Sequence, residues 1–113
     1  MKDAEVRDDI ANMARRKNAR IVPRSPEMPC DWNPTTVINP EVGMPFTDIS
    51  AWHYIADLAE SGHPIKEIIL DQPKGDKGYV MVVKLEASAP DLYIKVQLKG
   101  GKIFGRSFHY SRW

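Results

Sequence analysis

The sequence predicts one α+β domain, in which N-terminal helices and a proline-rich arm pack on an antiparallel sheet of three to four strands. Three patterns predict it: apolar residues at helical spacing in two early segments, six prolines between positions 23 and 45, and period-two alternation near the C-terminus. The 113 residues suit a single domain, with one modest core. We divide the chain into a helix at 1–18, an arm at 19–45, and a helix followed by the sheet at 46–113.

Two helices are expected before the sheet. In the first, acidic residues gather near the N-terminal end and basic residues near the C-terminal end, which suits the helix dipole. The second begins where Thr47 or Asp48 can cap it and runs to about Ser61, because Gly62 and Pro64 stop it. We expect its buried stripe to be Ile49, Trp52, Ile55, Ala56 and Ala59.

The arm is rich in proline, so regular structure is not expected there. Its apolar residues, Trp32 among them, indicate that it packs across the domain surface or orders on a partner. After the second helix we expect a strand at 66–71, a loop at 72–78, a central strand at 79–85 and a turn at 86–90.

Residues 91–110 predict a β-hairpin, because apolar and polar residues alternate before and after two glycines. Gly100 and Gly101 supply the positive φ angles that a two-residue turn needs. Facing residues then lie at equal distances from this turn, which places Lys95 opposite Arg106. A longer loop would shift these partners.

The hairpin has two different faces. The aliphatic face, which belongs on a core, carries Leu92, Ile94, Val96, Leu98, Ile103 and also His109. The other face carries Tyr93, Lys95, Gln97, Phe104, Arg106, Phe108 and Tyr110. Cations between aromatic rings suit a surface that holds phosphates while bases stack on the rings. The alternative is a second small core under the N-terminal segments, with the cationic groups reaching past it to water.

The distribution of charge supports a basic hairpin on an acidic body. The net charge is only +1, but residues 91–113 hold five basic groups and one acidic group, against four and ten in residues 25–90. Cys30 is the only cysteine, so an intramolecular disulfide is impossible and a reducing compartment is expected. The sequence shows no apolar run that would span a membrane and no recognisable zinc site. We expect a cytoplasmic protein without a metal or another cofactor.

The hairpin resembles the last two strands of MqsR-type toxins, which are bacterial mRNA interferases of the RelE-like ribonuclease fold. The residues that carry the resemblance are Leu92-Tyr93-Ile94-Lys95-Val96-Gln97-Leu98 and Ile103-Phe104-Gly105-Arg106-Ser107-Phe108. The order of elements, helices and then a meander of strands, is similar from about residue 50 onward. Residues 1–45 match nothing in that family.

The resemblance implies a RelE-like fold and a metal-independent endoribonuclease of a toxin–antitoxin pair, in which the ribose 2′-hydroxyl attacks the adjacent phosphate. Its partners would be RNA, a cognate antitoxin and, as a further candidate, the ribosome. The matching candidates for catalysis are Lys95, Arg106 and Tyr93, to which we add His109 and Tyr110 as proton carriers. The candidates for RNA binding are Gln97, Phe108, Lys99 and Lys102.

Two other functions remain open at this point. A non-catalytic module could use the same cations to hold nucleic acid or an acidic protein, and an accessory protein could use the hairpin only as part of its sheet. A catalytic function requires acid and base groups within hydrogen-bond reach of Lys95 and Arg106, whereas binding requires only charge and stacking surfaces.

Overall fold

The computed structural model describes residues 3–71, 74–85 and 88–111. The helices are α1 (Asp3–Ala14) and α2 (Asp48–Glu60), with short 3-10 segments η1 (Lys17–Ala19) and η2 (Pro34–Thr36). The strands are β1 (Arg20–Ile21), β2 (Asp31–Trp32), β3 (Ile38–Asn39), β4 (Met44–Pro45), β5 (Lys66–Ile69), β6 (Lys77–Val83), β7 (Leu92–Lys99) and β8 (Lys102–Tyr110). The predicted α+β class is confirmed. Parts of three predicted segments, 1–18, 72–78 and 86–90, lie outside the described residues.

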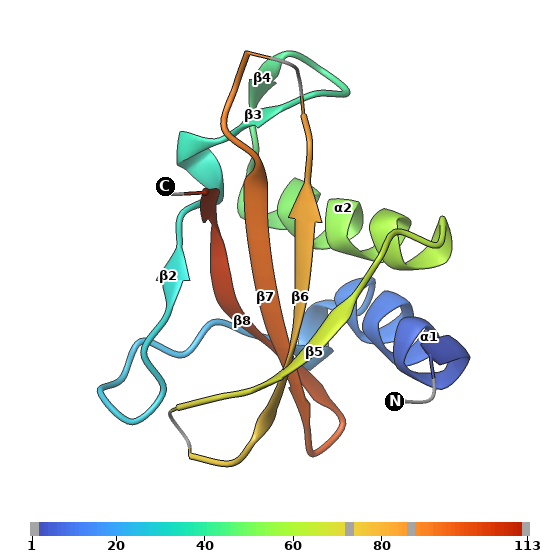
Figure 1. Ribbon diagram of the computed structural model, residues 1–113, viewed down its shortest axis with the longest axis vertical. Coiled ribbons are helices and arrows are strands. Elements are labelled where there is room, and N and C mark those ends of the chain that lie inside the picture. The colour runs from blue at the N-terminus through green and yellow to red at the C-terminus, as the bar shows by residue number, and fades with distance from the viewer. Residues whose placement is uncertain (1–2, 72–73, 86–87, 112–113) are drawn as a thin grey trace.

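The main sheet has the strand order β1-β8-β7-β6-β5, and β2 also pairs with β8. Strands β5 to β8 are antiparallel, as predicted, and β6 is a central strand. The arm was expected to lack regular structure, but β1 and β2 add to the edge of β8 in parallel. They are two residues long each, because prolines interrupt the ladder on this side. Figure 1 shows the arm running beside β8, away from β5.

Both helices lie against one face of the sheet, behind the strands in Figure 1. Thr47 caps α2, since its hydroxyl oxygen accepts a hydrogen bond from the Ser50 backbone N–H at 3.0 Å. Trp52 and Ile55 are buried in the core, as expected. Ile49 is 64% exposed, so its placement on the buried stripe was wrong. The helix is turned so that Ala51 is buried on the opposite flank of the stripe.

A β-bulge changes the register of the β7–β8 hairpin. Near the turn the pairs are as predicted, with Leu98 opposite Ile103. The register shifts between Lys95 and Val96, and Lys95 then pairs with Ser107. One extra residue, Arg106, is therefore inserted in β8, and the bulge presents Arg106 and Ser107 together to Lys95. The predicted direct pair of Lys95 with Arg106 was wrong in register.

Beyond the bulge, the faces of β8 are exchanged relative to the prediction. Phe108 and Tyr110 pair with Ile94 and Leu92, on the side of the helices. His109 pairs with Tyr93 on the opposite side. The expectation that His109 lies on the aliphatic face was therefore wrong, and so was the placement of Phe108 and Tyr110 beside the cations. One inserted residue is sufficient to exchange the two faces of the strand, because side chains alternate with a period of two.

The helices α1 and α2 have 12 and 13 residues. In the part of the chain that the structure describes, no helix is long and apolar enough to cross a membrane.

Candidate functional site

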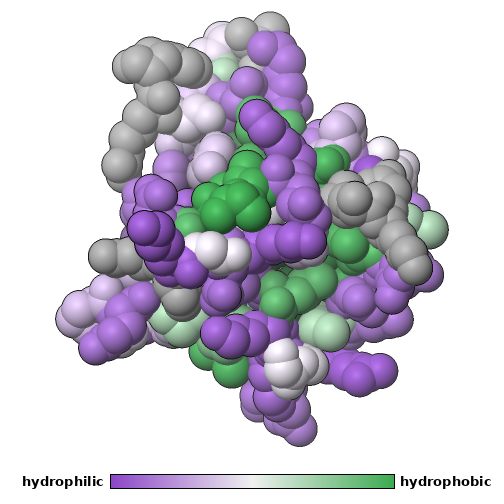
Figure 2. Space-filling model, turned by 60° about the horizontal axis from the view of Figure 1, so that its bottom comes forward, coloured by the Kyte–Doolittle hydropathy of each residue, from purple (hydrophilic) through white to green (hydrophobic). Residues whose placement is uncertain are grey.

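The face of the sheet that points away from the helices, here called the open face, carries Tyr93, Lys95, Gln97, Phe104, Arg106, Ser107 and His109. It is partly covered by the segment after β5, since Leu70 is only 4% exposed and contacts the Gly78 position. In Figure 1, β5 crosses in front of the sheet. Figure 2 shows the lower end of the molecule, where hydrophobic patches are separated by hydrophilic side chains.

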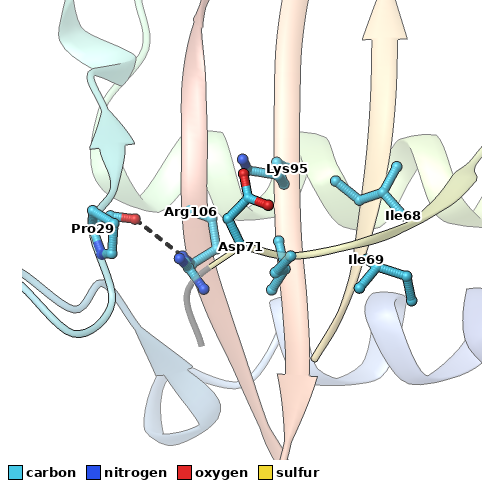
Figure 3. Close-up of a pocket in the computed structure, with 7 residues that line it drawn as sticks. Pro29, Ile68, Ile69, Asp71, Lys95 and Arg106 are labelled. Carbon is cyan, nitrogen blue, oxygen red and sulfur yellow. Dashed lines mark hydrogen bonds between the residues drawn. The ribbon is translucent and has the colours of Figure 1, made fainter. Parts of the chain in front are cut away.

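A pocket of about 360 Å³ lies on the open face, between the segment that follows β5 and the strands β7 and β8. Figure 3 shows the side chains around it, with Arg106 and Asp71 on one side and two isoleucines on the other. The lining residues are Pro29, Ile68, Ile69, Leu70, Asp71, Lys95 and Arg106. The pocket therefore combines two cations, one carboxylate and apolar walls.

Arg106 is held from both sides. Its Nη1 donates to Gln97 Oε1 at 2.8 Å, and its Nε donates to the backbone oxygen of Pro29 at 3.2 Å. The residue as a whole is only 3% exposed. Burial lowers the pKa of the Arg106 guanidinium from its ordinary value. The position of Arg106 is thus fixed before any ligand arrives, and its charge is only partly hydrated.

The hydrogen bond to Arg106 belongs to a chain of polar groups. Gln97 is 1% exposed, and its Nε2 donates to Asp76 Oδ2 at 2.9 Å. The same Asp76 oxygen accepts a hydrogen bond from Lys99 Nζ at 3.2 Å. Because the amide of Gln97 has a donor and an acceptor, Asp76 on one side and Arg106 on the other fix its orientation. Gln97, which we expected to bind RNA, holds Arg106 instead.

Lys95 is the second cation of the pocket and is half-buried. Burial lowers its pKa first, the charge of Arg106 lowers it further, and the carboxylate of Asp71 raises it. In Figure 3 the Asp71 carboxylate lies next to the Lys95 side chain. Two cations that are both partly removed from water favour the binding of an anion, since an anion replaces lost hydration. A phosphate is one such anion.

His109 lies on the open face, two residues beyond Ser107. Its Nε2 is 3.4 Å from Asp31 Oδ2, and its Nδ1 donates to the backbone oxygen of Tyr110 at 2.8 Å. Its ring stacks on Tyr93, with 5.5 Å between the ring centroids and 27° between the planes. Both ring nitrogens face oxygen atoms of the protein. The β-bulge thus brings an imidazole ring to the face that holds the cations.

Other predicted site residues lie elsewhere. Phe108 is fully buried, with its ring against Trp32 and Phe46, so the surface role assigned to it was wrong. Tyr110 Oη accepts a hydrogen bond from the Ile38 backbone N–H, in a separate pocket.

The two lysines expected to bind RNA are exposed. Lys99 forms an ion pair with Asp76, and Lys102 Nζ donates to the backbone oxygen of Asn18 at 2.8 Å. Both lie at the turn end of the hairpin, beyond the row that carries Lys95.

The site also contains residues that sequence analysis missed. Asp31 and Pro29 come from the arm, whereas Asp71 and Asp76 come from the connection between β5 and β6. These residues are distant from the hairpin in sequence, and no local pattern marks them. The one available signal was Trp32, because a large apolar residue in a proline-rich arm anchors its neighbours.

Comparisons with protein-family models, curated proteins and solved structures give no match for this chain. Among residues 3–71, 74–85 and 88–111, no group of three or more histidine, cysteine, aspartate or glutamate side chains lies together as metal ligands would.

Proposed function

We propose that the protein is an endoribonuclease toxin with a RelE-like fold, which binds the RNA backbone at Lys95 and Arg106 and cleaves it with the help of His109. One observation carries the proposal: the β-bulge places His109, oriented by Asp31, on the same face as the two cations. The Tyr93–His109 pair lies one step along the same face from the Lys95–Ser107 pair, roughly 7 Å away, so the proposal has the RNA backbone run from the pocket towards His109.

The proposed reaction needs no redox change and no cofactor. The 2′-oxygen attacks the adjacent phosphorus while its proton leaves to water, and the bond from phosphorus to the 5′-oxygen breaks. His109 gives the proton on Nε2, whose 3.4 Å contact with Asp31 is longer than the 2.8 Å hydrogen bond of Nδ1, to that departing oxygen, which leaves a 5′-hydroxyl and a 2′,3′-cyclic phosphate. Lys95 and Arg106 stabilise the charge that gathers on the phosphoryl oxygens.

The cellular part of the proposal follows from the resemblance to MqsR-type toxins. A toxin of this kind would act on mRNA in the cytoplasm and be neutralised by a cognate antitoxin, with the ribosome as a further candidate partner. The second candidate is a non-catalytic module that holds RNA, DNA or an acidic protein at the same cations. The two hydrogen bonds that fix Arg106 favour this binding module, since a fixed guanidinium can bind an anion without catalysing a reaction.

Inducible expression, with growth and total RNA followed together, tests the proposal. The wild-type protein should arrest growth and fragment RNA to 2′,3′-cyclic phosphate ends, whereas His109→Gln should do neither. His53→Gln is the matched control, because His53 is exposed on α2 and lies off the site. If the protein binds RNA but leaves it intact, the nuclease is excluded and the non-catalytic binding module is supported. Arg106→Ala is unsuitable as a test, because Arg106 is buried and hydrogen-bonded and its loss would also affect folding.

A further inference from the structure

We propose that the β3–β4 hairpin and the pocket beside it bind a short segment of another protein, in which one aliphatic side chain is flanked by lysine or arginine residues. This second pocket is lined by Tyr110, whose side chain lies on the side of the helices, whereas Lys95 and Arg106 line the pocket of the open face. The two sites are therefore separate, and the proposal stands whether or not the protein cleaves RNA.

The second pocket has a volume of about 280 Å³ and lies between the β3–β4 hairpin and the connection from β6 to β7. Figure 1 shows β3 and β4 next to the end of β6 and the start of β7, at the top of the view. The residues that line the pocket are Ile38, Pro40, Gly43, Leu85, Ala89 and Tyr110. None of these residues is charged, and the volume is below the usual range for small-molecule pockets. The pocket therefore suits a single apolar side chain of a peptide.

The β3–β4 hairpin also exposes apolar side chains around this pocket. Six large hydrophobic side chains are exposed among the described residues, and three of them, Ile38, Val42 and Met44, lie on this hairpin. Val42 and Met44 are each 65% exposed. The hairpin forms a two-stranded sheet of its own, outside the main sheet. Exposed apolar side chains that gather next to an apolar pocket are typical of a surface that binds another protein.

The Tyr110 hydroxyl adds a hydrogen-bond donor to the apolar walls. Its oxygen accepts a hydrogen bond from the Ile38 backbone N–H at 3.1 Å, and among the described residues no acceptor is found for its own proton. A phenol donates one hydrogen bond while it accepts others. The backbone carbonyl of a peptide that lies over the pocket would accept this proton. Apolar walls with one donor therefore suit a peptide better than an acyl chain, which offers no acceptor.

The charge around the second pocket favours a basic segment. In the described parts of 33–48 and 84–91, three residues are acidic and one is basic, so these two segments carry a net charge of −2. Glu41 follows the lining residue Pro40, and its charge adds to the effect of burial in raising the pKa of Tyr54 on α2. A second copy of this chain would bring the same acidic surface to a two-fold interface, where like charges repel. A basic partner meets no such repulsion.

The test selects binders from a phage-displayed library of random heptapeptides on the wild-type protein, with counter-selection on Ala89→Leu. Ala89 lines the pocket and is half-buried, so a leucine at this position fills the pocket without removing a hydrogen bond. We expect the peptides that bind only the wild type to share one aliphatic residue with lysine or arginine on both sides. Enrichment of peptides without basic residues would overturn the proposal, and so would the absence of any peptide that distinguishes the two proteins.

Fluorescence anisotropy with the most enriched peptide, labelled at one end, then measures the two contributions separately. Ala89→Leu should weaken binding about tenfold or more, because the aliphatic side chain loses its pocket. Glu41→Gln should weaken binding about twofold to fivefold, as expected for one exposed ion pair. Ala4→Leu and Glu5→Gln, the same changes at exposed positions on α1, should bind as the wild type does.

Two further outcomes would overturn the proposal. If a peptide with alanine in place of its aliphatic residue binds equally well, the contact depends on charge alone and the pocket is not used. If sedimentation shows that the wild-type protein self-associates and that Ala89→Leu abolishes this, the occupant is a second copy of the chain. None of these measurements involves RNA, so the failure of the proposed nuclease would leave them unchanged.

Discussion

Gly105 lies directly against the indole ring of Trp32. A Cβ at position 105 would come within 2.7 Å of Trp32 Cζ3, which is closer than carbon atoms approach in folded proteins. This contact locks the arm to β8, because Trp32 pairs with Phe108 in parallel and is 2% exposed. The residue before Trp32 is Asp31, so the same contact sets where the carboxylate meets His109.

The first prediction is that Gly105→Ala destabilises the protein by about 1–3 kcal/mol, because the added methyl overpacks the core. Urea unfolding followed by tryptophan fluorescence measures the change. The control is a double-mutant cycle with Trp32→Phe, which provides space. The cost of Gly105→Ala should be smaller in that background. A cost that is the same in both backgrounds would mean that Trp32 is not the obstacle.

This contact also shows the limit of prediction from the sequence. The helices, the strands of the hairpin and the Gly100–Gly101 turn follow from local periodicity, capping and glycine conformation; φ is 59° and 76° at the two glycines. The β-bulge does not follow from them. It depends on the tertiary packing of Phe108 against Trp32 and Phe46, which lie far away in sequence.

The error in register had a large consequence for the site. Strand alternation alone puts Tyr110 among the cations and His109 in the core, and one inserted residue reverses both. The position of Lys95 and Arg106 on one face could be predicted, since both lie at the bulge and not beyond it. The three aspartates around the open face come from the arm and from the β5–β6 connection, where long-range packing decides position.

The second prediction concerns Gln97, whose amide links Asp76 to Arg106. Gln97→Met keeps the volume but removes the acceptor of one Arg106 N–H in a buried place. We expect a loss of about 1–3 kcal/mol in the free energy of unfolding, measured by chemical denaturation. Leu98→Met is the control for a methionine on the same strand, because Leu98 is only half-buried. Equal stability of the Gln97→Met and wild-type proteins would show that the polar chain does not support Arg106.

The third prediction concerns the stability of Lys95→Gln. Because burial and Arg106 lower the Lys95 pKa, its charge opposes folding at neutral pH, and the variant should be equally stable or up to about 1 kcal/mol more stable. As pH rises towards 10.5, the folded wild-type protein loses this proton before the unfolded chain does. The stability of the wild type should therefore rise towards that of the variant, as denaturation at several pH values would reveal. A clear loss of stability in Lys95→Gln would mean that the lysine supports the fold.

The fourth prediction tests whether Lys95 contacts phosphate. Lys95→Gln should flatten the dependence of log affinity on log salt by about one unit, as expected for one lost phosphate contact. Lys84→Gln is the matched control, because Lys84 is exposed just after β6 and pairs only weakly with Asp91 at 4.0 Å. Fluorescence anisotropy with one labelled, non-cleavable RNA gives both slopes. An unchanged slope in Lys95→Gln would mean that Lys95 does not contact an RNA phosphate.

The last prediction separates the proposed proton donor, His109, from the residue that positions it, Asp31. His109→Gln removes the proton donor, so cleavage should fall by on the order of 10²–10⁴-fold with RNA affinity nearly unchanged. Asp31 acts through His109, since it is 3.4 Å from His109 Nε2, and it is a positioning residue. Asp31→Asn should therefore cost less, about tenfold in the rate of cleavage at saturating RNA, with RNA affinity nearly unchanged. A loss of stability with an unchanged cleavage rate of the folded protein would mean that Asp31 only supports the arm. Full cleavage by His109→Gln would leave Tyr93, which stacks on the same ring, as the remaining proton donor on this part of the open face.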